Sequence, residues 1–325
     1  MEEGFVLPDY DDCKIAILIP CYNEEKTIAR VICDFKSEIP NADIYVFDNN
    51  STDNTVKEAT RAGAIVRYEK RQGKGNVVRS MFRSVDADLY VLVDGDGTYP
   101  ADRVHELIKP ILTEDADMVI GSRLHSMSNS RFKPLNRMGN RLFLFLLNAI
   151  FDVHVTDLLS GYRAFSRRVV KSLPLLSRGF EIETELTVKC LERDYKIVEV
   201  PVALSPRAEG SSSKIKIFSD GLLIFNTIFA LFRDYKPLTA FGMLGGFLVF
   251  CGLIPGVVVI SEFIATSYIS RVPSAILAVG LVLSGLLVAF IGLVLHTIAR
   301  HFQELDLQMQ NLNEIVDKSL HKMKE

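Results

Sequence analysis

The chain is poor in the residues that hold metals through sulfur or imidazole. Its five cysteines form no CxxC pair, and its six histidines form no HExxH motif. These absences exclude a cysteine-based zinc ribbon, a disulfide-stapled small domain and a zincin-type site. We therefore expect buried free thiols in a reducing compartment. The cysteines concerned are Cys13, Cys21, Cys33, Cys190 and Cys251.

Other missing signals narrow the function further. The N-terminus, MEEGFVLPDYDD, is acidic and lacks a basic region followed by an apolar one, so we expect no cleaved signal peptide. The formal net charge of −3 gives no reason to expect a nucleic-acid partner. Tryptophan is absent, which excludes every motif that requires it. The bulk of the chain is expected to remain in the cytoplasm.

The first part of the chain alternates short apolar runs with helix-like segments. The runs predict strands at residues 14–20, 43–48, 65–68, 89–94 and 118–121, with helices at 24–37, 52–61, 75–85 and 103–112. This alternation predicts an α/β domain whose mostly parallel sheet is covered on both faces. Ligands of such sheets bind at the carboxyl ends of the strands. Polar clusters follow those ends at Asn23/Glu24, at 48–53 and at 94–96.

Two long apolar runs follow. Residues 238–260 carry no charge, and residues 273–299 contain only His296 as an ionisable group. Runs of this length predict two transmembrane helices, and a pair of buried core helices is the alternative. Gly242/Gly246 and Gly252/Gly256 form small-xxx-small pairs, which favour close packing of the spans or a homo-oligomer.

Basic residues flank this predicted hairpin. Lys214, Lys216, Arg233 and Lys236 precede it and Arg300 follows it, whereas the connecting loop has only Arg271. The positive-inside rule therefore places both flanks in the cytoplasm. Residues 211–236 have an amphipathic pattern typical of interfacial helices, with an ordinary core helix as the alternative; residues 140–151 are a second such segment. We predict four parts: a catalytic domain at 1–210, a juxtamembrane segment at 211–236, two spans at 237–299 and a cytosolic helix at 300–325.

The strongest local chemical signal is Asp94-Gly95-Asp96-Gly97. Two carboxylates at i and i+2 after an apolar strand can share a divalent cation with substrate phosphates, and Mg²⁺ and Mn²⁺ prefer such oxygen ligands. The glycines permit a tight turn. Taken alone, the same four residues also fit a plain turn, so the neighbouring clusters decide between the two interpretations.

The order and spacing of these clusters resemble the family-2 inverting glycosyltransferases with the GT-A fold. The resemblance covers roughly the first 210 residues and includes the segments 71–75, 121–123 and 156–163. It implies a divalent metal and a nucleotide-sugar donor. Carried over by position, it assigns Pro20, Tyr22, Glu24 and Asp48 to the nucleoside, Lys74 and Arg123 to the donor pocket, Asp94 and Asp96 to the metal and diphosphate, and Asp157 to catalysis.

The order of the predicted parts narrows the resemblance. The QxxRW motif of the processive synthases is absent, because the chain has no tryptophan. A catalytic domain, a basic amphipathic segment and two spans look like dolichyl-phosphate mannose synthases and bacterial polyprenyl-phosphate glucosyltransferases of the GtrB type. This implies transfer of glucose from UDP-glucose to undecaprenyl phosphate at the cytoplasmic face of a bacterial inner membrane. GDP-mannose is the alternative donor, and an inactive membrane scaffold is the alternative of another class.

A lipid phosphate needs cationic or hydroxyl partners near headgroup depth. The candidates are Arg131, Arg137, Arg163, Arg207, Ser212 and Lys214, each of which singly also fits a solvated surface position. Three glutamates, Glu181, Glu183 and Glu185, either face solvent on a helix or help to shape the sugar pocket. Asp157 is expected to orient the acceptor or to take its last proton, and the alternative is that it pairs with Arg163 to hold its loop.

Overall fold

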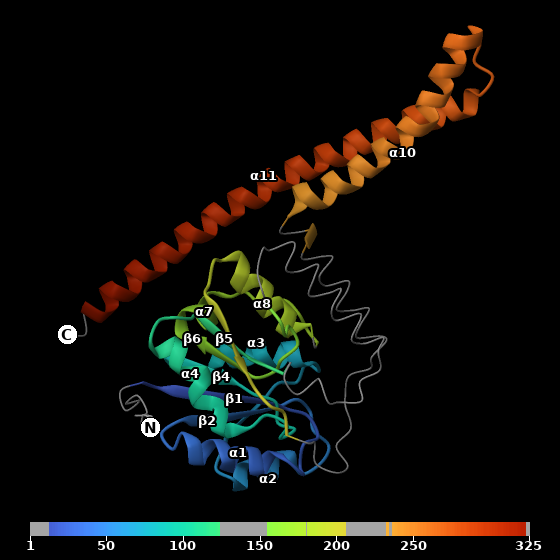
Figure 1. Ribbon diagram of the computed structural model, residues 1–325. Coiled ribbons are helices and arrows are strands. Elements are labelled where there is room, and N and C mark those ends of the chain that lie inside the picture. The colour runs from blue at the N-terminus through green and yellow to red at the C-terminus, as the bar shows by residue number, and fades with distance from the viewer. Residues whose placement is uncertain (1–12, 124–154, 180, 206–231, 234–235, 323–325) are drawn as a thin grey trace, which may run out of the picture. The chain divides into compact units, whose positions relative to one another are not determined.

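The computed structural model describes residues 13–123, 155–179, 181–205, 232–233 and 236–322. The chain divides into two compact units, residues 1–228 and 229–325, and each is described separately. The predicted interfacial segments at 140–151 and 211–236 lie almost entirely outside the described residues, so they stay predictions. Figure 1 shows the arrangement of elements within each unit.

The first unit is built on a seven-stranded sheet of order β3-β2-β1-β4-β6-β5-β7. The strands are β1 (Ile15–Cys21), β2 (Asp43–Asp48), β3 (Ile65–Tyr68), β4 (Leu89–Leu92), β5 (Met118–Ser122), β6 (Arg163–Ser166) and β7 (Ile197–Pro201). Strand β6 is antiparallel to β4 and β5, and the other pairings are parallel. The mostly parallel α/β sheet predicted from the sequence is therefore confirmed.

Two strands were not predicted. Strand β6 has only four residues, of which Arg163 is charged, and β7 alternates around Glu199 as a half-buried strand. Neither has the continuous apolar run that marks a central parallel strand. The predicted strand-like run at 153–156 lies partly outside the described residues, and Val155 and Thr156 are not in a strand.

The helices of this unit cover both faces of the sheet. They are α1 (Ile28–Glu38), α2 (Thr55–Arg61), α3 (Lys74–Ser84), the short 3₁₀ turn η1 (Ala101–Arg103), α4 (Val104–Leu112), α7 (Arg167–Ser172) and α8 (Ile182–Glu192). Helix α1 buries one stripe at helical spacing, Ile28, Val31, Ile32 and Phe35, as an amphipathic helix on a sheet does.

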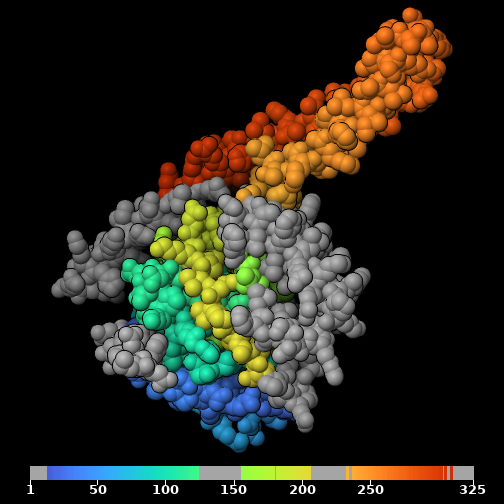
Figure 2. All heavy atoms as spheres, viewed as in Figure 1, coloured from blue at the N-terminus to red at the C-terminus, as the bar shows by residue number. Residues whose placement is uncertain are grey.

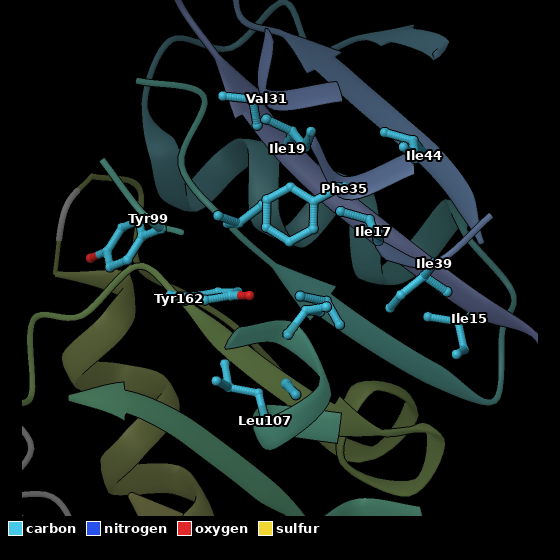
Figure 3. Close-up of a cluster of buried hydrophobic side chains, with 14 of the residues drawn as sticks. Ile15, Ile17, Ile19, Val31, Phe35, Ile39, Ile44, Tyr99, Leu107 and Tyr162 are labelled. Carbon is cyan, nitrogen blue, oxygen red and sulfur yellow. The ribbon is translucent and has the colours of Figure 1, made fainter. Parts of the chain in front are cut away.

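Successive side chains of β1 point to opposite faces of the sheet, and the core has one part on each face. Ile15, Ile17 and Ile19 join the apolar cluster with α1 and α4 (Figure 3). In that cluster the Phe35 and Tyr162 rings meet edge to face at 6.0 Å. On the opposite face, Phe82 of α3 packs edge to face on Phe165 of β6, with ring centroids 5.4 Å apart. A sheet buried on both faces holds its strand ends rigidly, which matters for the site below.

All five cysteines are free thiols. Cys21 and Cys190 are buried, Cys13 and Cys251 are half-buried, and Cys33 is exposed. The prediction of free thiols is thus confirmed, but the expectation that all are buried is wrong for Cys33, which lies on the outward face of α1.

Within the described part of the second unit, two helices are long and apolar enough to span a membrane, over 237–266 and 272–302. They are α10 (Pro237–Thr266) and α11 (Val272–Lys322). Only 17% of the most apolar window of each is buried, so these are not the buried core helices of the alternative interpretation. In the space-filling view they form a narrow column (Figure 2). Large apolar side chains of both helices are exposed, among them Phe247, Leu286 and Phe290. The polar segment after residue 300 continues α11 without a break instead of forming a separate helix.

Glycines make the contact between α10 and α11. A Cβ at Gly245 would lie 2.5 Å from the carbonyl oxygen of Gly285, and one at Gly252 would lie 2.9 Å from Leu281 Cβ. Gly242 and Gly246 meet nothing within 4 Å. Of the predicted small-xxx-small pairs, the second therefore supplies part of the helix contact, and the first faces away from it.

We expect Gly245→Ile to separate α10 from α11, because overpacking of a close contact costs roughly 1–3 kcal/mol. The readout is a disulfide between Gly256→Cys and Ala278→Cys, two positions whose Cβ atoms would lie 3.7 Å apart, within disulfide range. In a Cys251→Ala background, the oxidised fraction measured by mass spectrometry should fall severalfold. Gly246→Ile is the matched control and should leave it unchanged; equal yields in both variants would contradict the packing.

Candidate functional site

Parallel pairing brings the predicted polar clusters to one edge of the sheet. Strand β1 pairs with β2 up to Cys21 and Asp48, and with β4 up to Leu18 and Leu92. The segments that follow these three strands therefore leave the sheet at the same edge, as expected for parallel strands.

The loops after β1 and β2 are bonded to each other. The Asn23 amide donates to Ser51 Oγ at 2.9 Å, the Thr52 amide donates to Asn23 Oδ1 at 2.7 Å, and the Glu24 amide donates to Thr55 Oγ1 at 2.8 Å. Asn23 has a φ of 53°, a left-handed conformation that asparagine tolerates better than most residues. These bonds fix the two loops as one rigid rim.

The residues predicted to contact a nucleoside lie on or beside this rim. Pro20 and Glu24 are half-buried, and the Tyr22 ring is 38% exposed. Asp48 is buried, and both of its carboxylate oxygens accept from the Ser51 amide, at 3.2 and 3.3 Å. The structure thus brings all four to one edge, and their contact with a nucleoside stays a prediction.

Asn49 is a buried residue that the sequence reasoning missed. Its amide nitrogen donates to the carbonyls of Glu69 and Arg71 at 2.8 and 2.9 Å, and its oxygen accepts from the Gly73 amide at 2.8 Å. Asn49 therefore holds the loop that leads into α3. Its only sequence signal is its place directly after a buried strand.

The start of α3 is closed by the protein itself. The Gly75 amide donates to the carbonyls of Arg178 and Gly179, each at 3.1 Å. A Cβ at Gly73 or Gly75 would overlap the backbone carbonyls of residues 177–178, so only glycine allows this approach. These carbonyls accept hydrogen bonds from amides at the helix start, so those amides are not available to an anion. The positively charged group at this position is the Lys74 ammonium.

Lys74 lies between two carboxylates. Its Nζ is 2.5 Å from Asp94 Oδ1 and 2.6 Å from Glu183 Oε1. Burial alone lowers the pKa of Lys74, but the charges of Asp94 and Glu183 outweigh it and raise the pKa above its ordinary value. The lysine therefore stays positively charged beside the aspartate pair.

The turn at Asp94–Gly97 is held from both sides. Thr27 Oγ1 donates to the Gly95 carbonyl at 2.7 Å, and the Arg30 guanidinium donates to the Gly97 carbonyl at 3.2 Å. Asp96 Oδ1 accepts from the Thr98 amide at 3.1 Å and from its hydroxyl at 2.7 Å. The spacing of the two carboxylates is thus set by packing and hydrogen bonds before any substrate binds.

The chemistry of this donor set fits a divalent metal. Asp94 and Asp96 are half-buried hard oxygen ligands at the end of β4, and within the described residues no group of three His, Cys, Asp or Glu side chains forms a closed metal cage. Two protein carboxylates that leave the remaining positions to substrate oxygens are the pattern of a Mg²⁺ or Mn²⁺ site shared with phosphates.

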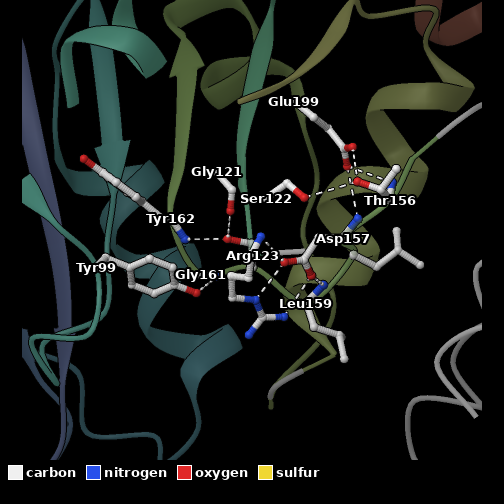
Figure 4. A network of polar contacts seen from close by, with 12 residues as sticks. Tyr99, Gly121, Ser122, Arg123, Thr156, Asp157, Leu159, Gly161, Tyr162 and Glu199 are labelled. Atoms are coloured by element: carbon white, nitrogen blue, oxygen red, sulfur yellow. Dashed lines mark hydrogen bonds and ion pairs between the residues drawn. The ribbon is translucent and has the colours of Figure 1, made fainter. Parts of the chain in front are cut away.

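Asp157 forms a bidentate ion pair with Arg123 (Figure 4). Arg123 donates from Nε to Asp157 Oδ2 at 2.7 Å and from NH2 to Oδ1 at 2.8 Å, and its backbone amide donates to Oδ2 at 3.0 Å. The Leu159 amide adds a bond to Oδ1 at 3.1 Å. The predicted alternative partner, Arg163, is not the residue that pairs with Asp157.

These bonds decide the protonation state of Asp157. Burial raises the pKa of its carboxyl group, but hydrogen bonds from Arg123 and the charge of that guanidinium outweigh burial, so the pKa is lowered. Both carboxylate oxygens are already accepting hydrogen bonds. Asp157 is therefore a firmly ionised carboxylate with little capacity to act as a base.

Glu199 of β7 stabilises the turn that carries Asp157. Its Oε1 accepts from the amides of Thr156 and Asp157 at 2.9 and 3.1 Å, and its Oε2 accepts from the Thr156 hydroxyl at 2.5 Å. The sequence reasoning missed Glu199, because it belongs to a strand that was not predicted and lies more than 40 residues from its partners.

The turn also packs directly on the aspartate pair. A Cβ at Gly161 would overlap the Asp94 carboxylate, and the Gly161 amide donates to the Tyr99 hydroxyl at 2.9 Å. The segment 157–161 therefore lies against Asp94 and leaves room only for glycine. Tyr99, which the sequence reasoning did not single out, anchors this approach.

Arg163 does not lie where an acceptor phosphate would need it. It is 0% exposed, and it donates to the carbonyls of Ser160 and Leu158 at 2.9 and 2.7 Å and to Thr187 Oγ1 at 2.8 Å. Its donors are used to hold the 157–161 turn from inside the protein. We therefore drop Arg163 from the proposed acceptor ligands.

The three glutamates at the start of α8, with Glu181 as its N-cap residue, do not face solvent as a group. Glu183 and Glu185 are buried, and Glu185 accepts from the Leu176 and Ser177 amides at 2.9 and 2.8 Å and pairs with Lys189 at 2.8 Å. Glu181 accepts from the amides of Arg178 and Gly179. The solvent-facing interpretation is thus wrong for Glu183 and Glu185.

The remaining predicted acceptor ligands lie outside the described residues and stay predictions. They are Arg131, Arg137, Arg207, Ser212 and Lys214.

Comparison with known proteins agrees with this geometry. The profile of the family described as glycosyl transferase family 2 matches residues 16–173. Glycosyltransferase AglJ of Haloferax volcanii is 35% identical over 302 residues, which cover 93% of this chain and 98% of the relative. A dolichyl-phosphate hexose transferase of the same organism is 28% identical over 219 residues, 67% of this chain and 93% of the relative.

The fold has counterparts among solved structures. Glucosyl-3-phosphoglycerate synthase of Mycobacterium tuberculosis, in complex with Mn²⁺, uridine diphosphate and glucosyl-3-phosphoglycerate, superposes with a TM-score of 0.60 at 24% identity. The superposition covers 71% of this chain and 85% of that one. This likeness, together with the sheet described above, confirms the predicted GT-A-like fold.

We expect Asp157→Asn to lower the stability of the protein at neutral pH by about 3 kcal/mol, because it removes the carboxylate charge that neutralises the largely buried Arg123 guanidinium. Since the folded pKa of Asp157 is depressed, its contribution is complete above the unfolded value of about 3.9 and disappears as the pH falls through the folded value. The difference in thermal unfolding temperature should therefore shrink below about pH 4.

Asp86→Asn is the control. Asp86 is 66% exposed and pairs with Arg167 and Lys171 at 3.0 and 3.2 Å, an exposed arrangement worth about 0–1 kcal/mol. Equal, pH-independent effects of the two substitutions would contradict a buried ion pair at Asp157.

Proposed function

The chain belongs to glycosyl transferase family 2, and on that premise we propose that it transfers a hexose from a nucleoside-diphosphate sugar to a polyprenyl phosphate at a membrane surface. The donor proposed first is UDP-glucose and the acceptor is undecaprenyl phosphate. The catalytic unit lies on the cytoplasmic side of the bacterial inner membrane in this proposal, as the basic flanks of the spans favour.

One observation carries the proposal: the same chain joins an aspartate pair suited to a diphosphate with two helices long and apolar enough to span a membrane. A lipid-linked acceptor is confined to the membrane, so an enzyme that uses it benefits from a permanent anchor. A relative that matches 98% of its length to this chain is named a glycosyltransferase, and another is named for dolichyl phosphate and hexose.

The reaction is a single displacement at the anomeric carbon. An oxygen of the acceptor phosphate forms a bond to C1 of the hexose as the bond from C1 to the diphosphate oxygen breaks. The nucleoside diphosphate leaves with the electron pair, and the configuration at C1 inverts. Asp94 and Asp96 would hold a divalent metal, which would supply charge neutralisation for the departing diphosphate. The Lys74 ammonium adds positive charge at the same edge.

Asp157 has an orienting role in this proposal. The second pKa of a phosphate monoester is about 6, so the acceptor is mostly a dianion at neutral pH and needs no general base. A bare carboxylate nearby would repel that dianion. The guanidinium of Arg123 neutralises Asp157 and so removes that repulsion. The ion pair therefore orients Arg123 toward the anionic substrates.

The direct test uses purified protein, undecaprenyl phosphate, Mg²⁺ or Mn²⁺ and a panel of UDP- and GDP-sugars. We expect hexosyl transfer with UDP-glucose and loss of transfer with chelator. Asp96→Ala should lower turnover at least 100-fold, because charge neutralisation by a metal is worth several kcal/mol. Asp102→Ala, in the exposed η1 turn, is the control. Transfer by Asp96→Ala at wild-type rate would contradict the site, and transfer only from GDP-mannose would contradict the donor.

The pH dependence of kcat separates the two roles of Asp157. An orienting role predicts that Asp157→Asn lowers kcat by a factor that stays constant from about pH 6 to pH 8. A base role predicts a loss that lessens over that range, because the acceptor then ionises unaided. We expect the constant factor, since Asp157 is ionised and fully hydrogen-bonded. An unchanged kcat at every pH would remove Asp157 from the site.

A further inference from the structure

We propose that Glu183 is a positioning residue that lets Lys74 and a divalent cation share Asp94. This inference rests on the proposed function, because it concerns the charge of the same donor-binding edge. It assigns a role to a buried carboxylate on α8, far in sequence from the aspartate pair.

The Lys74 ammonium pairs with two carboxylates at the same time. The Lys74 side chain is 10% exposed and the Glu183 side chain 5% exposed, and the ammonium lies 2.6 Å from Glu183 Oε1 and 2.5 Å from Asp94 Oδ1. Glu183 Oε2 is buried and has no hydrogen-bond partner among the described residues. Burial of an ionised carboxylate costs free energy unless a nearby positive charge compensates it.

Both ends of the Lys74–Glu183 contact are held by the backbone. The first turn of α3 donates to the carbonyls of Arg178 and Gly179, in the loop before α8. Arg79 of α3 donates to the carbonyls of Leu176 and Ser177 at 2.9 Å each. Helix α3 is thus bonded to the loop that leads into α8, and this fixes the segments from which Lys74 and Glu183 approach each other.

A charge count shows what Glu183 contributes. Lys74 and Asp94 alone sum to zero, and a neutralised aspartate is a poor ligand for a divalent cation. With Glu183 the three side chains sum to one negative charge, which a divalent cation entering at Asp94 can use. Lys74 can then remain beside the diphosphate because Glu183 carries its counter-charge.

Glu185 provides a matched comparison within the same helix. It is as buried as Glu183 and also pairs with a lysine, Lys189, at 2.8 Å. Its other contacts are backbone amides of the preceding loop. A role limited to neutralising a buried lysine would make the two glutamates equivalent, whereas the proposed role belongs to Glu183 alone.

The test measures the affinity for Mn²⁺ by electron paramagnetic resonance, with the full chain in detergent and saturating UDP. Glu183→Gln should weaken Mn²⁺ binding about tenfold through the loss of one nearby charge, and Glu185→Gln should leave it unchanged even if it lowers the unfolding temperature. Glu183→Asp keeps the charge and should bind Mn²⁺ within about twofold of wild type.

A double variant tests the charge count and also removes the buried lysine that has lost one of its two carboxylate partners. Lys74→Met combined with Glu183→Gln restores one net negative charge, so Mn²⁺ affinity at saturating UDP should return toward wild type. Unchanged Mn²⁺ affinity in Glu183→Gln, equal losses in Glu183→Gln and Glu185→Gln, or no recovery in the double variant would each overturn the inference. If the wild-type protein fails to bind Mn²⁺ in the presence of either UDP or GDP, the proposed function is overturned as well.

Discussion

The parallel pairing of β1 with β2 and β4 is the constraint on which the site depends. It places the segments after three strands at one edge of the sheet, and the helices on both faces hold that edge in place. Asp48, Asp94 and Asp96 therefore lie at the same edge of the sheet, although up to 48 residues separate them along the chain. The loops then add hydrogen bonds such as those of Asn23 and Asn49, which make the rim rigid without a ligand.

Charge inside the first unit is paired rather than avoided. Lys74 lies between Asp94 and Glu183, Arg123 clasps Asp157, and Lys189 pairs with Glu185. Buried ion pairs contribute little net stability but are expensive to break, so each fixes the geometry of its neighbours. Arg163 differs, because its donors are used by two carbonyls and a hydroxyl. It thereby shapes the turn that carries Asp157 and packs Gly161 on Asp94.

The second unit depends on close packing of two helices through glycines. Helices α10 and α11 contact through Gly245, Gly252 and Gly285. Close backbone approach through small residues is the packing typical of transmembrane helices, which gain little from apolar burial. Their large apolar side chains point outward, which is favourable only in an apolar environment. The two units thus combine a charged, hydrogen-bonded edge with two helices long and apolar enough to span a membrane, and the proposed function rests on that combination.

The sequence by itself determined what depends on local pattern. Apolar runs set the central strands, their ends located Asp94 and Asp96, and run length identified the two long helices. Only the tertiary structure decided the partners of the charged residues: Arg123 for Asp157, Glu183 for Lys74, Glu199 behind the turn, and a buried position for Arg163. The first three of these contacts join residues 34 to 109 positions apart, and no local periodicity records such contacts. They follow from how helices and strands pack, because the free energy of a buried charge depends on what surrounds it and not on its neighbours in sequence.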